Sequence, residues 1–394
     1  MVSGKKTVNV EFIGFTILSG MIYFSNNVVM TIIPLRMADG GLSYGMIGTV
    51  MSAVAVGLLV IKILTGYLSD LVGTKRFILL ALAGLAGSSF LLAWAEGVFM
   101  YSVLMAALGI FRGIFQAVSG AYVLEMSEEG SYGRFYGTVE SVTSFLASVG
   151  GMISGLLYRF QEGKYALYIC SILLAAGFLW TFKGLKDNHK IDRQAISLTK
   201  IFCSMNKRIV IFCVLIFIQS FVAGPMWNFI IPMYCYNVMR FSPAKVGFLM
   251  SLDELVSAPT YMVAGNVVDK VNILRFNILF LLTTALSGFL MAKTTSWIGF
   301  MGIFLICSVS ISCTFIGIPK QRVVYVQKER KGFELALISL WGSIGDALGS
   351  NILGKVAEKY GITLCIYIFV AAYVIMAVLV MIPVIYGKNG MIKI

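Results

Sequence analysis

The chain of 394 residues has few charged side chains, since Asp, Glu, Lys and Arg together make up 12% of it. A soluble globular domain carries about 25% charged residues, so this composition excludes an ordinary soluble protein. Hydrophobic residues make up 59%, and the mean hydropathy is +0.89. The apolar residues form long runs rather than an alternating pattern, which excludes a membrane barrel and predicts an all-α integral membrane protein.

Histidine is almost absent, because His189 is the only one. A histidine-based proton relay or metal centre is therefore excluded. The seven cysteines show no metal-ligand spacing, so we expect no metal and no other cofactor. The sequence also lacks a glycine-rich phosphate loop ending in Lys-Ser/Thr and a nucleophile–base set. We therefore expect neither an ATP-driven pump nor an enzyme.

Acidic residues are outnumbered by basic ones, 18 against 31, which gives a net charge of +13. The basic residues flank the apolar runs instead of forming one stripe, which disfavours nucleic acid as a partner. If both termini are cytoplasmic, 21 of the 31 lie on the cytoplasmic side, 8 outside, and Lys62 and Arg112 within the membrane. Since this bias follows the positive-inside rule, we predict a multi-pass protein of the cell membrane with both termini in the cytoplasm.

Twelve apolar runs are long enough to cross the lipid bilayer as helices. The predicted spans are 10–36, 43–69, 76–95, 98–123, 134–158, 165–184, 208–236, 243–268, 273–292, 297–322, 333–357 and 361–386. The connections between them are short, except for a polar stretch at 184–207. We therefore predict a six-helix bundle at 1–183, a cytoplasmic linker at 184–207 and a second six-helix bundle at 208–394. We expect the protein to be a monomer.

The second half of the chain repeats the first at an offset of 199 residues. The stretch from Gly66 to Arg76 is matched by the stretch from Gly265 to Arg275, with Asp70 matched by Asp269. The same offset relates further identical pairs: Ser43 and Ser242, Gly48 and Gly247, Met51 and Met250, Ser52 and Ser251, Gly133 and Gly332, Gly150 and Gly349, Gly155 and Gly354. A duplicated membrane bundle places its binding site between the two copies.

The stretch from Gly66 to Arg76, in a chain of twelve spans and two repeated halves, resembles the loop signature of the major facilitator superfamily. That signature reads Gly-x-Leu-(Ser/Ala)-Asp-(Arg/Lys)-x-Gly-(Arg/Lys)-(Arg/Lys). Here Leu71 and Thr74 stand where basic residues are usual. The resemblance implies a cytoplasmic gate, and a topology anchor with solvated charges is the alternative. The candidate gating residues are Gly66, Asp70, Gly73, Lys75, Arg76, Glu125, Arg134, Asp269 and Arg275.

Arg112 in the fourth span resembles the membrane-buried arginine that this family associates with proton coupling. It lies about fifteen residues into its span, hence roughly 20 Å from the outer edge. Pairing with a buried carboxylate is the structural alternative. The fifth span is similar to the family's antiporter motif but departs from it at three positions, Leu146, Gly151 and Ser154. Its matching glycines are Gly137, Gly150 and Gly155.

Three carboxylates lie near mid-depth in the spans: Asp253 and Glu254 in the eighth and Asp346 in the eleventh. Charged residues within a bilayer are costly and usually functional. In the absence of usable histidine, these acids and Arg112 are the candidate proton-coupling residues, and protons are an expected partner. Because neighbouring residues on a helix point about 100° apart, we expect only one of Asp253 and Glu254 to face the central cavity.

Polar and aromatic residues of the spans are candidates to line a substrate cavity between the two halves. They are Tyr23, Asn26, Asn27, Gln116, Glu140, Gln219, Trp227, Asn228 and Trp341. Packing in the core is the alternative for each aromatic residue, and pairing with Lys62 is the alternative for Glu140. Acids, amides and aromatic rings suit an amphiphilic or cationic solute, whereas Arg112 suits an anion, so the charge of the substrate stays open.

The favoured function is secondary active transport of a small organic molecule across the cytoplasmic membrane by alternating access, in the form of proton-coupled efflux. The resemblance also leaves open a proton symporter or a facilitator that imports a polar metabolite. A membrane receptor that transports nothing is a third possibility. It is disfavoured because the buried acids would then carry a cost without a purpose.

Overall fold

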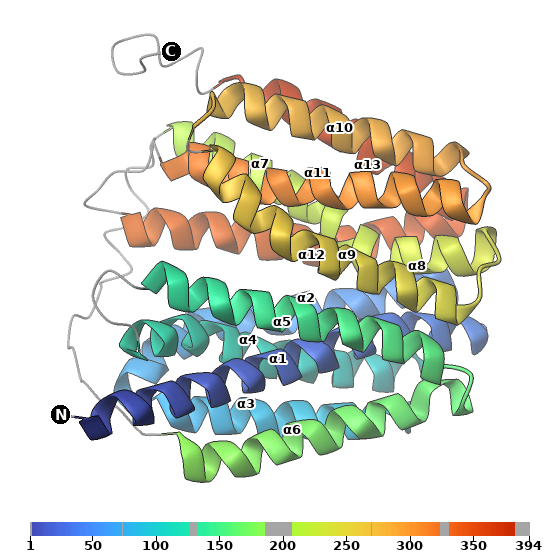
Figure 1. Cartoon of the computed structure of the whole chain (residues 1–394). Coiled ribbons are helices and arrows are strands. Elements are labelled where there is room, and N and C mark those ends of the chain that lie inside the picture. Colours follow the sequence, from blue (N-terminus) through green and yellow to red (C-terminus); the bar gives the residue numbers. More distant parts are fainter. Residues whose placement is uncertain are drawn as a thin grey trace.

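The computed structural model describes residues 2–72, 74–126, 132–185, 207–268, 270–323 and 331–382. The described residues form helices and short connections without any strand. Figure 1 shows the helices running roughly parallel to one axis, with the first and last parts of the chain at the same end. We call that end the inner end and the opposite one the outer end.

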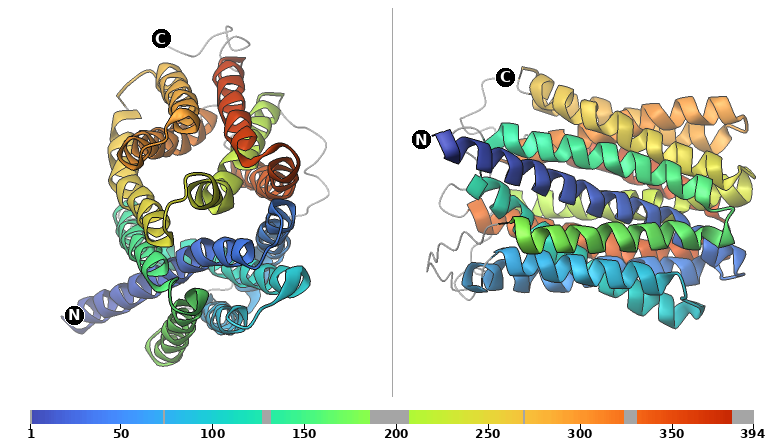
Figure 2. Two further views of the ribbon diagram at one scale, coloured as in Figure 1. Left: turned by 90° about the vertical axis from the view of Figure 1, so that its right-hand side faces the viewer. Right: turned by 60° about the horizontal axis from the view of Figure 1, so that its bottom comes forward.

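The first six helices form one bundle, the N half. Figure 2 shows it packed beside the second bundle, the C half, when the molecule is viewed along the helices. Within the N half, α2 packs on α4, α1 on α5, and α3 on both α4 and α6. Its helices are α1 (Val2–Asp39), α2 (Tyr44–Val72), α3 (Thr74–Leu92), α4 (Gly97–Met126), α5 (Tyr132–Leu157) and α6 (Lys164–Gly184).

The C half begins with a span that is not a uniform α-helix. It is divided into α7 (Lys207–Pro225), the π-helical segment η3 (Met226–Ile230), the short α8 (Ile231–Met233) and a second π-helical segment, η4 (Tyr234–Val238). The remaining helices are α9 (Pro243–Val268), α10 (Ile273–Lys293), α11 (Trp297–Val323), α12 (Lys331–Tyr360) and α13 (Ile362–Leu379).

Each of the twelve predicted spans coincides with a helical segment, so the fold prediction is confirmed. Within the described residues, ten helices are long and apolar enough to cross a membrane by themselves. The two helices outside that set are α9 and α12, because acidic and other polar residues lower their hydropathy. These two helices carry Asp253, Glu254 and Asp346.

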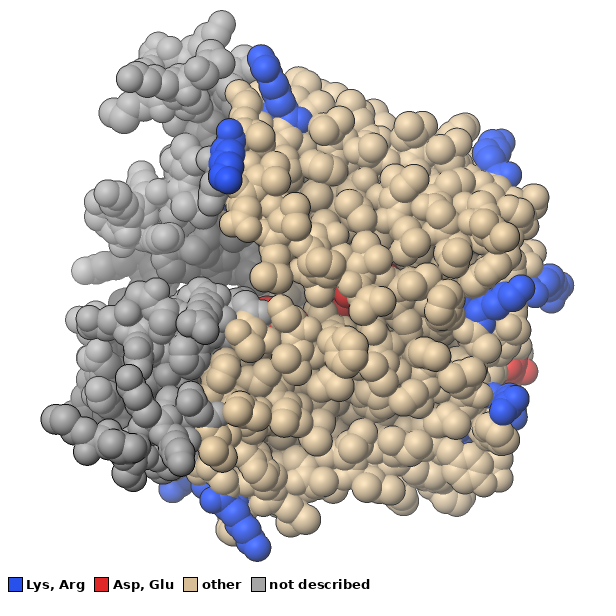
Figure 3. Space-filling model, in the orientation of Figure 1, with Lys and Arg blue, Asp and Glu red and all other residues tan. Residues whose placement is uncertain are grey.

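The outer surface of the bundle fits a membrane-spanning protein. On the face drawn in Figure 3, most of the surface between the two ends is uncharged, and lysine and arginine side chains lie towards the ends. Large apolar side chains face outward on the bundle, including Ile172, Leu179 and Met262, which are 68%, 66% and 62% exposed. Since lipid solvates apolar side chains, such exposure carries no cost in a bilayer.

Candidate functional site

Two residues of opposite charge, one from each half, line one cavity between the halves. Arg112 of α4 and Asp346 of α12 line the same small cavity, which has a volume of about 50 Å³. Asn228 of η3 and Ser343 of α12 line it too. A Cβ atom added to Gly224 would collide with the Asp346 carboxylate, so this glycine leaves the space in which the carboxylate lies.

A second polar group surrounds Tyr23 of α1. Its hydroxyl lies near the Gln116 side chain of α4 and within electrostatic reach of Arg112, Glu140 and Glu254. Tyr23 and Glu140 line a cavity of about 20 Å³ between α1, α4 and α5. These predicted residues therefore lie close together around the interface between the halves.

Asn27 and Glu254 connect the two halves directly. The Asn27 Nδ2 group of α1 donates a long hydrogen bond of 3.5 Å to Glu254 Oε1 of α9. The neighbouring Asn26 points towards the N half, where it lines a small cavity together with Arg112. Its Oδ1 atom is buried and has no hydrogen-bond partner among the described residues.

Asp253 faces the other way, into the C half. Its carboxylate lies against Ser308 of α11 and Trp227 of η3, and its Oδ1 atom is buried without a hydrogen-bond partner among the described residues. The Trp227 ring stacks on Phe304 with centroids 6.1 Å apart. Glu254 thus contacts the N half, whereas Asp253 contacts C-half residues, as the 100° step of the helix requires.

The π-helical turns that hold Trp227 and Asn228 have a cause in the sequence. Pro232 has no amide hydrogen and its ring clashes with the carbonyl four residues earlier, which belongs to Asn228. The backbone widens on both sides of Pro232: Ile231 N–H donates to Met226, and Met239 N–H donates to Tyr234. Such π-bulges often occur at functional sites, yet the span pattern alone predicts a regular helix here.

Two predicted cavity residues lie elsewhere. Gln219 of α7 is buried inside the C half, where its Nε2 group donates to Thr314 Oγ1 at 3.1 Å. Trp341 of α12 is 40% exposed and makes an edge contact with Phe217, with centroids 6.0 Å apart. The structure therefore groups neither of them with the residues around Arg112.

The side-chain environment of most predicted gating residues lies outside the described part of the molecule. Gly73 and Asp269 are not among the described residues. For Gly66, Asp70, Glu125 and Arg134 the structure describes the helix but not the side-chain environment. Three gating candidates are described: Lys75 donates to the Phe182 carbonyl at 3.1 Å, whereas Arg76 and Arg275 are exposed. Gly265, the counterpart of Gly66, has open space beside it, and none of the described helices packs closely on it.

The outer end is closed by two helix pairs, which we call the seams: α2 with α12, and α5 with α9. In the first seam, a Cβ added to Gly354 would lie 2.8 Å from both Gly48 Cα and the Tyr44 carbonyl oxygen. In the second seam, a Cβ added to Gly155 would lie 3.0 Å from Gly247 Cα and 2.7 Å from the Pro243 carbonyl oxygen. Only glycine permits backbones to approach this closely.

Polar contacts that no sequence motif indicates add to the outer closure. Asp39 at the end of α1 accepts hydrogen bonds from Tyr158 of the N half at 2.6 Å and from Tyr236 of the C half at 2.8 Å. A tyrosine hydroxyl is protonated at neutral pH, so both tyrosines donate and the Asp39 carboxylate accepts. The glycine pairs of the repeat indicate that this region is important, but no motif includes the two tyrosines.

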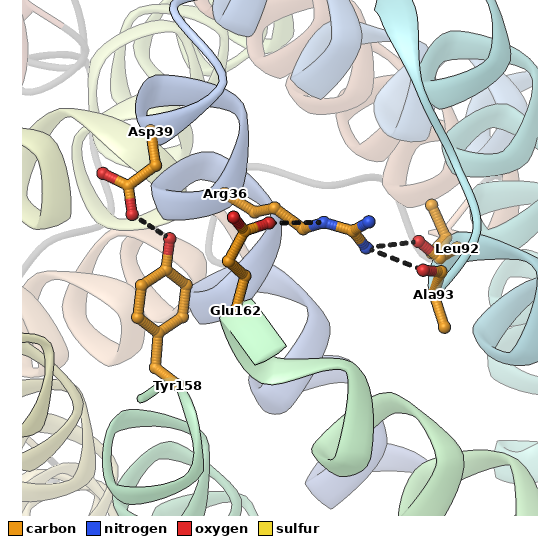
Figure 4. Close-up of polar contacts among 6 residues, drawn as sticks. All are labelled: Arg36, Asp39, Leu92, Ala93, Tyr158 and Glu162. Atoms are coloured by element: carbon orange, nitrogen blue, oxygen red, sulfur yellow. Dashed lines mark hydrogen bonds and ion pairs between the residues drawn. The ribbon is translucent and has the colours of Figure 1, made fainter. Parts of the chain in front are cut away.

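Arg36, near the outer end of α1, connects this helix to the end of α3 and to Glu162, as Figure 4 shows. Its guanidinium is buried and donates to the carbonyl oxygens of Leu92 and Ala93 at 3.0 and 3.1 Å, at the end of α3. It also forms an ion pair of 3.6 Å with Glu162. A cation at a helix C-terminus is favourable because the free carbonyl groups carry partial negative charge.

Comparisons with known proteins agree with the fold. The sequence model of the Major Facilitator Superfamily matches residues 15–350. An uncharacterized MFS-type transporter of Methanocaldococcus jannaschii is 24% identical over 332 residues, which are 80% of this chain and 83% of that protein.

Two further similarities were found. The multidrug resistance protein MdtG of Proteus mirabilis is 24% identical over 224 residues, 54% of this chain and 55% of that protein. A solved bacterial homolog of the human lysosomal transporter Spinster, in an inward-facing and occupied conformation, has a TM-score of 0.84 at 11% identity. The match covers 97% of this chain and 98% of that one.

Proposed function

The chain belongs to the major facilitator superfamily, and on this premise we propose that it exports a small organic solute across the cytoplasmic membrane in exchange for protons, by alternating access. It is a membrane transporter of small molecules and not an enzyme. Efflux, proton coupling, a monomeric state and cytoplasmic termini are parts of the proposal.

The observation that carries the proposal is the shared cavity of Arg112 and Asp346 between the halves. A carboxylate there can bind a proton or attract the arginine of the opposite half. Because charges within a membrane interact strongly and are costly to leave unpaired, a change in protonation alters how the two halves attract one another. A proton can thereby bias the switch between the two conformations.

The conformation supports alternating access. The outer end is held shut by the two seams, whereas Figure 3 shows acidic side chains in a crevice between the halves. In the proposed cycle, solute enters from the inner end, the seams separate, and solute leaves outward. Protons then enter from outside, neutralise Asp346 or the Asp253–Glu254 pair, and close the outer end again. The loops at Gly66–Arg76 and Gly265–Arg275 form the inner gate.

Transport in oriented vesicles tests the direction. Inverted membrane vesicles are loaded with acid, and a lipophilic cationic dye is added as the probe solute. Antiport predicts that the dye triggers proton efflux from the vesicles. Asp346→Asn and Asp253→Asn abolish this coupling, and full gradient-driven transport by both variants contradicts the proton assignment. Thermal-shift screening identifies other solutes, because a ligand that binds the folded protein raises its apparent stability.

A proton symporter or facilitator that imports a polar metabolite is the second candidate. It is favoured by the fifth-span glycines, of which Gly150 packs against the backbone of Phe24 and Gly155 against α9. These glycines serve close helix packing, and the motif is incomplete, so the motif alone does not require antiport. Co-accumulation of proton and solute in the vesicles identifies this alternative.

A further inference from the structure

A large hollow lies away from the central site, on the membrane-facing side of the C half. It is a groove of about 810 Å³ between α9, α10 and α11. Twelve of its fifteen lining residues are apolar, and they include Leu255, Pro259, Val263 and Leu279. A hydrocarbon chain is therefore the chemistry that fits most of its length.

One end of the groove is charged. Among the described residues, Arg275 is the only charged one in the lining, and it lies at the inner end, where α9 ends and α10 begins. The other two polar lining residues are satisfied within the protein: Asn272 accepts from the Leu274 and Arg275 amides, and Thr260 donates to the Val256 carbonyl. Only the exposed guanidinium remains to attract a ligand's charge, and it attracts an anion.

The length of the groove matches one leaflet of a bilayer. Its lining on α9 runs from Leu255 to Val267, a rise of about 18 Å at 1.5 Å per residue. Half of a hydrocarbon core of ~30 Å is about 15 Å. A lipid with its phosphate at Arg275 would thus place its acyl chain along the groove.

The residues that line the groove are not repeated in the first half of the chain. Pro259, Ala264 and Cys313 line it, and the positions 199 residues earlier hold the larger or branched Val60, Thr65 and Ile114. The arginine is shared, however, since Arg275 corresponds to Arg76, which is also exposed at the start of its helix. The N half therefore supplies a matched position with the same charge but other residues around it.

We propose that this groove, lined by α9, α10 and α11 and ending at Arg275, is a binding site for an anionic phospholipid of the leaflet at the inner end. The acyl chain lies between Val263 and Leu279, and the headgroup phosphate pairs with the guanidinium. The groove lies away from the central cavity, but Arg275 also belongs to the proposed inner gate. Lipid retention, and not transport, is therefore the readout, and it does not depend on the proposed direction of transport.

Native mass spectrometry of the purified full-length chain tests the proposal, with phosphatidylglycerol and phosphatidylcholine of identical acyl chains as probes. We expect the wild-type protein to retain phosphatidylglycerol about fivefold better, the contribution of one basic residue at an anionic surface. Arg275→Gln abolishes this preference, whereas Arg76→Gln keeps it. Since Arg275 is exposed, its replacement leaves the folded protein intact.

A second pair of variants tests the apolar part. Val263→Trp fills the groove and reduces retention of both lipids several-fold, whereas Leu286→Trp, which alters an exposed residue of α10 outside the groove, does not. Equal retention of the two lipids by wild type overturns the proposal. So does an equal loss in Arg275→Gln and Arg76→Gln, which would mark general surface charge, or unchanged retention in a folded Val263→Trp protein.

Discussion

The two seams at the outer end have the same backbone geometry and different side-chain chemistry. The two contacts are related by the repeat. Gly48 in the first half corresponds to Gly247 in the second, and Gly354 in the second corresponds to Gly155 in the first. The carbonyl neighbours follow the same rule, since Ser350 corresponds to Gly151 and Tyr44 to Pro243. The close crossing of helices is thus inherited from the duplication.

The polar contacts across the seams do not repeat. In the seam of α2 and α12, Asn351 donates to Thr49 Oγ1 at 3.0 Å, but the corresponding residues of the other seam are Met152 and Phe248. That seam has instead a hydrogen bond of 2.6 Å from Ser251 Oγ to the Ser148 carbonyl. The two seams therefore share the close backbone contacts at their glycines, whereas the side-chain hydrogen bonds differ between them.

Breaking the backbone contact should have the largest effect, and an equal one in both seams. Gly48→Val and Gly247→Val each place side-chain atoms into the opposite helix, which costs about 1–3 kcal/mol and shifts the conformational equilibrium about fivefold to 150-fold towards an open outer end. The distance between spin labels at Phe99→Cys and Ile298→Cys measures the shift. Both positions are exposed, and they correspond to each other at the offset of 199 residues.

The labels require a suitable background and control. The six described native cysteines are buried, so the introduced ones react preferentially. Gly87→Val and Gly302→Val serve as controls because both glycines have open space beside them. If only one seam responds, the two crossings are not equivalent and the symmetry argument is wrong.

Removing one tyrosine hydroxyl should have a smaller effect that differs between the halves. Tyr236→Phe removes the hydrogen bond to Asp39 that joins the halves, and we expect an outer-open shift of about fivefold, the value of a hydrogen bond worth about 1 kcal/mol. Tyr158→Phe removes a bond to the same carboxylate within the N half. It should lower thermal stability without changing the label distance, and equal distance changes in both variants would contradict this assignment.

The smallest expected effect comes from one of the side-chain contacts that do not repeat. Asn351→Ala removes the hydrogen bond to Thr49 at a half-buried site, and we expect a shift of about threefold in the same distance measurement. Met152→Ala at the corresponding position of the other seam should leave the distribution unchanged. A response to Met152→Ala as large as that to Asn351→Ala would show that packing, and not the hydrogen bond, holds the seam.

The fold could be predicted from the sequence because each span is recognised from local features, namely the length of its apolar run and the basic residues beside it. These features occur in all twelve spans. The positions of Arg112, Glu254 and Asp346 between the halves followed from the rule that charges avoid lipid. Gln219 could not be placed, because its partner Thr314 is 95 residues away and the helix can turn it to either side. The bonds from Tyr158 and Tyr236 to Asp39 are equally non-local.

The central claim is that duplicated glycines let the halves move, while the unduplicated acids Asp253, Glu254 and Asp346 make the movement respond to protons. The most direct test is the distance between labels at positions 99 and 298 as the pH is lowered, with no solute present. We expect acid to increase the outer-closed population in the wild-type background, since protons close the outer end in the proposed cycle. We also expect Asp346→Asn, combined with Asp253→Asn and Glu254→Gln, to remove this dependence. A distance that is independent of pH in the wild type, or equally pH-dependent in the triple variant, would contradict the central claim.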